Sequence, residues 1–284
     1  MNMELRIYTL ADDYAGYNSP YWAQHGISFL IEVEDNGIHK RILFDTGSYA
    51  EPILFNMKLL GIDPKTIDTI VLSHNHFDHT GGLIGILKHI KKNIPIIAHQ
   101  NIFKTSFAVE PAFLYAGMPP KVKREAEDLG AIWILTRDPL KLASMITTTG
   151  EVTKRRDFEK TSIGLYEIRD GRIIQDPLED EISLVITTPK GLVVITGCSH
   201  PGIISIIETA TTLTGIKQVR AVIGGLHLIN ASKERIERTV QLLAELSLNV
   251  YAGHCTGLKA EALIQMKLGE KFEKLHAGKT ITLR

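Results

Sequence analysis

The sequence has few of the features that mark secreted or membrane-spanning proteins. It has only two cysteines, Cys198 and Cys255, in 284 residues, whereas a secreted disulfide scaffold would have more. Its longest apolar stretch, residues 182–198, is interrupted at 189–191 by a proline, a lysine and a glycine. It therefore does not approach the roughly 20 apolar residues of a membrane helix. The first ten residues are too polar for a signal peptide. We expect a cytoplasmic protein with no membrane partner.

The sequence also lacks an excess of charge of either sign. Lysine plus arginine and aspartate plus glutamate both number 32, so the formal net charge is zero. A neutral chain has no general attraction to nucleic acid, and we expect no nucleic-acid partner. Hydrophobic residues make up 44% and charged residues 23% of the chain, which is typical of a globular protein. The length fits one large domain, and we expect a single domain over residues 1–284.

Short β-rich runs alternate with helical patterns in both halves of the chain. Asp35-Asn36-Gly37 provides turn chemistry between two of the runs, and Ser232 with Glu234 nearby indicates a helix start. Hairpins followed by strand–helix alternation in each half predict an α/β fold: an αββα sandwich of two mixed sheets with helices on the outer faces. The predicted strands are 5–10, 27–33, 40–44, 69–72, 94–98, 183–187, 192–196, 220–223, 250–252 and 280–283, and the predicted helices are 82–91, 203–213, 233–246 and 259–267.

The segment from residue 103 to about 144 has a different composition. It contains Pro111, Pro119, Pro120 and Pro139. We interpret it as an insertion, and two alternatives stay open: a cap over an active site, or a plain surface excursion.

Candidate metal-binding residues are concentrated in one predicted loop. Three histidines and an aspartate lie within six residues, after an apolar β-run and before a glycine pair and a predicted helix; they are His74, His76, Asp78 and His79. Imidazole nitrogens and carboxylate oxygens are ligands that zinc and iron accept. In an extended loop the rings of His74 and His76 can point the same way. Asp78 and His79 diverge and suit a second ion. The loop therefore predicts a two-metal site.

This His-x-His-x-Asp-His pattern resembles the signature of the metallo-β-lactamase superfamily. The resemblance implies two divalent metal ions, zinc first with manganese or iron as alternatives, each completed by a later histidine. It extends upstream to Leu43-Phe44-Asp45-Thr46-Gly47, where the resemblance implies that Asp45 orients a ligand without touching metal.

Three later histidines each follow an apolar β-run that ends in glycine. They are His200, His227 and His254. We predict that His200 and His254 are metal ligands, and that His227 contacts substrate or donates a proton. Thr256, two residues after His254, is a further candidate for substrate contact.

The sequence departs from the superfamily pattern at Cys198. Many relatives have Thr-Gly-Asp at a strand end, where the aspartate bridges the metals, but this chain has Thr196-Gly197-Cys198. Either Cys198 takes that position as a thiolate or His200 supplies the ligand. We favour His200 and expect Cys198 to lie behind the ligands. A buried free cysteine is also ordinary core, and we expect Cys255 to be structural.

The phrases around these histidines resemble one subgroup of the superfamily, the synthase of a dihydropterin-methyl-ribofuranosyl-aminobenzene phosphate on the way to methanopterin. The resemblance implies a small, phosphorylated substrate, with Asp78 sharing ligand and general-base duties. A homo-oligomer is left open. The alternatives are a hydrolase of a phosphodiester, lactone or thioester, and a di-iron redox protein. A nuclease and a non-catalytic metal sensor are less favoured.

Overall fold

A computed structural model describes residues 3–35, 37–160 and 164–284. Asn36 of the predicted Asp35-Asn36-Gly37 turn lies outside these residues. The chain divides into two compact units. Among the described residues, the first unit comprises 3–35, 37–136, 164–180 and 276–284, and the second comprises 137–160 and 181–275.

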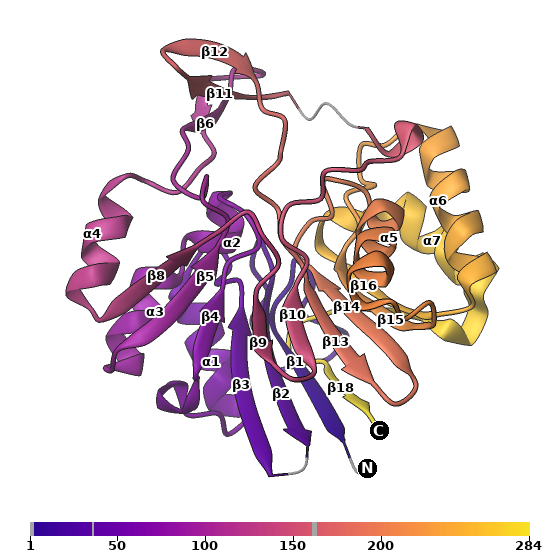
Figure 1. Ribbon diagram of the computed structural model, residues 1–284, viewed down its shortest axis with the longest axis horizontal. Coiled ribbons are helices and arrows are strands. Elements are labelled where there is room, and N and C mark those ends of the chain that lie inside the picture. The colour runs from indigo at the N-terminus through magenta and orange to yellow at the C-terminus, as the bar shows by residue number, and fades with distance from the viewer. Residues whose placement is uncertain (1–2, 36, 161–163) are drawn as a thin grey trace. The chain divides into compact units, whose positions relative to one another are not determined.

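The first unit is built on a seven-stranded mixed sheet (Figure 1). The first four strands in its spatial order pair antiparallel and bury most of their apolar residues, and from the fourth strand onward the neighbours pair parallel. The strands, in spatial order, are β18 (Thr280–Leu283), β1 (Glu4–Ala11), β2 (Ser28–Asp35), β3 (Ile38–Phe44), β4 (Thr69–Val71), β5 (Ile94–Ala98) and β8 (Ala131–Leu135).

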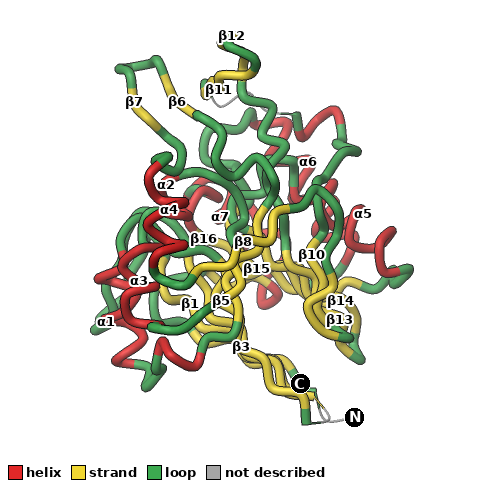
Figure 2. Tube along the Cα trace, turned by 60° about the vertical axis from the view of Figure 1, so that its left-hand side comes forward, coloured by secondary structure: helices red, strands yellow, loops and turns green. Residues whose placement is uncertain are grey.

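Three helices pack beside this sheet and bury an apolar face in the core of the first unit (Figure 2). They are α1 (Ala50–Leu59), α3 (Leu83–Ile90) and α4 (Lys121–Asp128). In α3 the buried residues are Leu83, Ile86, Leu87 and Ile90, the spacing that places apolar side chains on one stripe of a helix. A single 3-10 turn (Pro64–Thr66) and the four-residue α2 (Phe77–Thr80) complete the helical structure before β5.

A small four-stranded sheet also belongs to the first unit. Its order is β12 (Arg172–Gln175), β11 (Leu165–Arg169), β6 (Ser106–Ala108) and β7 (Leu114–Tyr115). The segment 103–144 thus provides β6 and β7 to this sheet, and α4 and β8 to the main body of the first unit. Whether part of it caps an active site stays a prediction.

The second unit has its own seven-stranded mixed sheet. Three helices, coloured orange to yellow in Figure 1, bury apolar residues in its core: α5 (Ile203–Thr214), α6 (Lys233–Leu246) and α7 (Leu258–Leu268). The strands, in spatial order, are β17 (Phe272–Lys274), β16 (Asn249–Gly253), β15 (Val219–Gly225), β14 (Gly191–Thr196), β13 (Leu184–Thr188), β10 (Ile146–Thr148) and β9 (Lys141–Ala143). Short 3-10 turns cover Asp157–Glu159, His254–Thr256 and Gly269–Lys271.

The prediction of two mixed sheets accompanied by helices is confirmed. Each predicted strand and helix has a counterpart within a few residues of its predicted ends. Ser232 caps α6 as predicted, because its side chain accepts a hydrogen bond from the backbone N–H of Arg235. No helix in the described part of the chain combines the length and the apolar character needed to cross a membrane.

Candidate functional site

The first histidine loop starts at the carboxyl edge of the parallel strands in the first unit. β3 and β4 are parallel neighbours, with Phe44 opposite Val71, so Asp45 and Ser73 emerge at the same edge. The backbone N–H of Asp45 donates to the carbonyl oxygen of Val71 (2.9 Å). Adjacent carboxyl ends of parallel strands are the usual place for a site in α/β proteins.

Asp45 is fully buried and forms the base of this loop. Its Oδ1 accepts a hydrogen bond from the backbone N–H of Ser73 (2.7 Å), and its Oδ2 accepts one from the Ser73 hydroxyl (2.7 Å). The same Oδ2 lies 2.7 Å from Nδ1 of His79. A carboxylate only accepts, so the Nδ1–H of His79 donates to it. Asp45 therefore contacts both Ser73 and His79 of the loop, and its role in orienting a metal ligand stays a prediction.

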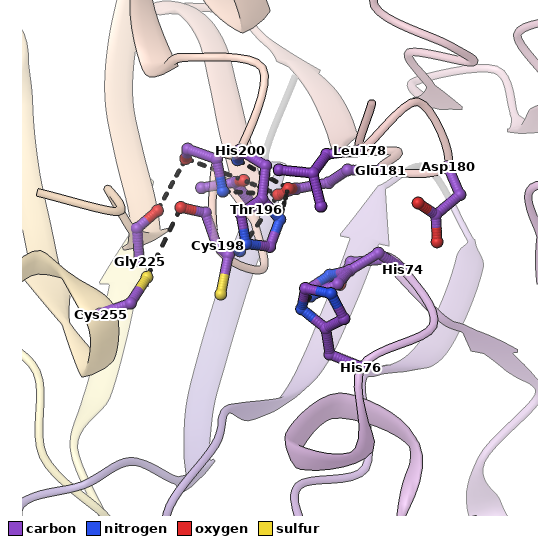
Figure 3. Close-up of polar contacts among 12 residues, drawn as sticks. His74, His76, Leu178, Asp180, Glu181, Thr196, Cys198, His200, Gly225 and Cys255 are labelled. Carbon is purple, nitrogen blue, oxygen red and sulfur yellow. Dashed lines mark hydrogen bonds and ion pairs between the residues drawn. The ribbon is translucent and has the colours of Figure 1, made fainter. Parts of the chain in front are cut away.

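His74 and His76 present ring nitrogens to one another. Nε2 of His74 lies 3.0 Å from Nδ1 of His76, and Nδ1 of His74 lies 2.8 Å from the hydroxyl of Ser73. Figure 3 shows the two rings side by side. Two nitrogens bound tetrahedrally to one zinc ion at about 2.0–2.1 Å would be about 3.3 Å apart. The pair therefore fits a metal ion with little adjustment.

Asp78 lies next to His79 in the same loop. Its Oδ2 is 3.4 Å from Nε2 of His79. Burial opposes charge on both His79 and Asp45 and raises the pKa of Asp45. Burial of His79 lowers its pKa, but the nearby carboxylates of Asp78 and Asp45 outweigh this effect and raise the pKa to about 10. A metal ion that takes Nε2 of His79 must therefore displace a proton, which makes binding pH-dependent.

A second histidine reaches Asp78 from the chain before β2. Nε2 of His25 lies 3.5 Å from Oδ2 of Asp78, and its Nδ1 lies 2.7 Å from Oδ1 of Asp13. Gly26 follows with φ of +110°, and a Cβ at this position would collide with the carbonyl oxygen of Asp78. Glycine at position 26 is thus required by this close approach. Beyond their residue type, no pattern in the sequence marks His25 or Asp13.

The second unit brings the three later histidines to one edge of its sheet. β14, β15 and β16 are parallel neighbours, and each is followed by one of the loops that carry His200, His227 and His254. Three non-glycine residues in these loops have left-handed backbone: Ser199 (φ 63°), His227 (φ 44°) and His254 (φ 48°). Such conformations cost free energy and gather at functional sites.

Potential metal-ligating atoms lie close together in the second unit. They belong to His200, His227, Cys198, His254 and Cys255. The rings of His200 and His227 have centroids 4.4 Å apart, and the sulfur of Cys198 lies 3.4 Å from Nε2 of His254. Two sets of residues place their potential ligand atoms within 4.8 Å of one another. One set is Cys198, His200 and His227, and the other is Cys198, His254 and Cys255. The chemistry of both sets suits a soft or borderline metal ion.

The cysteine and threonine beside His254 also have internal contacts. The sulfur of Cys255 lies 3.5 Å from the carbonyl oxygen of Cys198. Burial raises its pKa, but contacts with Cys198, His254 and His227 outweigh this and hold the pKa well below the usual thiol value. The hydroxyl of Thr256 accepts a hydrogen bond from the backbone N–H of Leu226 (3.1 Å) and so braces the loop of His227. Substrate contact by Thr256 stays a prediction.

Buried polar residues that the sequence analysis did not identify surround both loops. In the first unit the ammonium of Lys104 lies 2.6 Å from carboxylate oxygens of Asp176 and Asp180. Burial alone would raise the pKa of Asp180, but Lys104 lowers it below its ordinary value. In the second unit Glu181 accepts backbone hydrogen bonds from the loop of His200. The one sequence signal is the acidic run at 179–181 directly before an apolar strand.

The chain is similar to known proteins along nearly its whole length. The model of the metallo-β-lactamase superfamily matches residues 25–227. A Methanocaldococcus jannaschii protein named 7,8-dihydropterin-6-methyl-4-(β-D-ribofuranosyl)-aminobenzene-5′-phosphate synthase is 58% identical, over 98% of this chain and 96% of its own. An uncharacterized protein of the same organism is 33% identical, over 92% of this chain and 94% of its own.

One solved structure extends this similarity to the fold. It is described as a metal-dependent hydrolase of the β-lactamase superfamily, is 28% identical, and superimposes with a TM-score of 0.81 over 98% of both chains. The fold is therefore that of the metallo-β-lactamases, as the resemblance implied. The family model and the two sequence relatives lead to one conclusion: this chain belongs to the metallo-β-lactamase superfamily.

Proposed function

We propose that this chain is a metal-dependent synthase that joins a dihydropterin-methyl diphosphate to a ribofuranosyl-aminobenzene phosphate. The observation that carries the proposal is the 58% identity over 98% of the chain to the protein with that synthase name. The compact His-Asp loop in the first unit supports the metal dependence.

The reaction is a displacement at carbon. The lone pair of the aromatic amine forms a bond to the methyl carbon on the pterin, and the bond from that carbon to the diphosphate oxygen breaks. The electron pair of that bond leaves with diphosphate, and the amine loses one proton to a base. Bound metal ions would neutralise the charge of the departing diphosphate.

The ligands that we propose in the first unit are His74, His76, Asp78 and His79. Their mutual distances and burial support this assignment. His200 and His254 are proposed as further ligands on the basis of the superfamily pattern. Two divalent ions are proposed, zinc first because imidazole and carboxylate suit it, with manganese or iron as alternatives.

Two residues are proposed to act on the substrate itself. Asp78, held between His79 and His25, would accept the amine proton while also serving as a ligand. His227 would contact a phosphate or give a proton to the leaving group, and its ring packs on that of His200. Asp45 and Cys198 are proposed to support ligands from behind. The proposal also includes a cytoplasmic location and a small phosphorylated substrate, with no nucleic-acid or membrane partner.

The test is a direct assay of the condensation. The purified holoprotein is mixed with the pterin-methyl diphosphate and the aminobenzene riboside phosphate, and product and diphosphate are measured by mass spectrometry. We expect equal amounts of both products, and none after chelation. No condensation by a protein with its full metal content would overturn the proposal.

A hydrolase is the second candidate, since the solved relative at 28% identity is described as a metal-dependent hydrolase. A panel of chromogenic phosphodiesters, lactones and thioesters, assayed with the same preparation, separates the two. Hydrolysis without condensation would favour the hydrolase.

A further inference from the structure

We propose that Asp180 and Glu181, neighbours in the sequence, are positioning residues, and that each fixes one of the histidine loops through its backbone amides. The inference rests on the proposed metal-binding function of these loops. Asp180 is the last residue of its segment in the first unit, and Glu181 is the first of its segment in the second.

Glu181 accepts hydrogen bonds from the backbone of the loop that carries His200. Its Oε1 accepts hydrogen bonds from the N–H groups of Cys198 (3.1 Å) and Ser199 (2.5 Å). Its Oε2 accepts one from the N–H of His200 (2.7 Å). Dashed lines in Figure 3 mark these contacts. Three consecutive amides thus converge on one carboxylate that is 1% exposed.

The same carboxylate also lies beside the ring of His200. Nδ1 of His200 lies 2.7 Å from Oε2 of Glu181. A proton on Nδ1, facing this carboxylate, would leave the lone pair on Nε2, the form that binds a metal ion. In the first unit Asp45 accepts a hydrogen bond from Nδ1 of His79, so both units place a buried carboxylate beside a histidine ring.

Asp180 contacts the backbone at the centre of the loop that carries His74 and His76. Its Oδ2 accepts a hydrogen bond from the backbone N–H of Asn75 (2.9 Å), the residue between His74 and His76. Its Oδ1 lies 2.6 Å from the ammonium of Lys104. The Asn75 amide group in turn donates to the carbonyl oxygen of Lys104 and to the hydroxyl of Ser106, both at 3.1 Å. These hydrogen bonds therefore anchor the backbone between His74 and His76 in a defined conformation.

A purely structural role would predict a different outcome from a positioning role. A structural residue stabilises the fold, and its loss lowers the melting temperature without changing the metal affinity of the molecules that stay folded. A positioning residue sets the geometry of ligands before metal arrives, so its loss weakens binding itself. Residues that orient metal ligands typically contribute 10–100-fold to metal affinity.

The experiment measures zinc affinity by competition with a chromophoric chelator, together with the melting temperature of the metal-free protein. The variants are Glu181→Gln, Glu181→Asp and Asp180→Asn, and Glu179→Gln is the matched control because it removes a neighbouring, less buried carboxylate. We expect about 10–100-fold weaker zinc binding for Glu181→Gln and Asp180→Asn, with wild-type affinity for the control. Glu181→Asp keeps the charge but shortens the reach to His200, and we expect a partial loss.

Two results would overturn the inference, and they differ from one another. Wild-type affinity in folded Glu181→Gln and Asp180→Asn overturns the positioning role alone. A wild-type protein that binds no zinc, manganese or iron overturns the proposed function together with the inference. If Glu181→Gln does not fold, Glu181→Asp and Asp180→Asn decide the question in the same way.

Discussion

His76→Ala is expected to remove bound metal and at least about 100-fold of the catalytic rate together. Nδ1 of His76 faces Nε2 of His74 at 3.0 Å, so the substitution removes one of two paired donor atoms. The loss of a ligand should exceed the 10–100-fold effect typical of residues that only orient ligands. Elemental analysis and the condensation assay on the same sample check the result.

The matched control for this variant is His89→Ala. His89 lies on the exposed side of α3, where its ring contacts the carbonyl oxygen of Gly85. We expect wild-type metal content and activity. If His76→Ala retained full activity with an empty site, the metal-dependent reaction would be wrong.

Lys104→Met is expected to destabilise the protein by about 3–5 kcal/mol, because it leaves buried carboxylates without their cation. The side chain of Lys104 is 8% exposed and those of Asp176 and Asp180 are 0% and 2% exposed. The ammonium lies 2.6 Å from an oxygen of each. Urea unfolding of the metal-free proteins measures the difference, and Lys88→Met on the exposed side of α3 is the control.

The effect of Lys104→Met should shrink in acid. Although burial opposes the charge, Lys104 lowers the pKa of Asp180 below its ordinary value. A carboxylate with a lowered pKa in the folded state contributes stability above its unfolded pKa and loses it as the pH falls through the folded pKa. We therefore expect the full difference near neutral pH and a smaller one below the ordinary carboxyl range. A difference under about 0.5 kcal/mol at neutral pH, typical of a surface substitution, would contradict the account.

The histidine loops could be located from the sequence because their signals are local. An apolar run followed by glycine and histidine marks a strand end, and parallel strands bring such ends to one edge. β14, β15 and β16 follow this rule, and His200, His227 and His254 emerge together in the second unit. Asp45 was identified through the family resemblance, since its contact with Ser73 spans 28 residues.

The residues that hold the loops could not be predicted in this way. Asn75 and Asp180 are 105 residues apart, and Lys104 and Asp180 are 76 apart. A contact over such a separation leaves no periodic pattern in the sequence. The strands of the small sheet are equally hidden, because β6 and β7 have only three and two residues and pair with strands from a distant part of the chain or with each other.

The sequence does not predict helix α1, because the usual capping residues are missing at its start. It begins after Tyr49, which makes no side-chain capping hydrogen bond, and it has Pro52 within its first turn. The usual start signals, a serine, threonine, aspartate or asparagine cap, are therefore missing. Packing in the core of the first unit, through Ile53 and Met57, stabilises the helix instead.

The most direct test is to count metal ions and product in one series of samples. The protein is stripped with a chelator, shown to remain folded by circular dichroism, and titrated with zinc, manganese or iron while condensation is followed. The account predicts an inactive stripped protein whose activity rises with added metal and levels off at two ions per chain. Full condensation activity in the stripped protein, with no detectable bound metal, would contradict it.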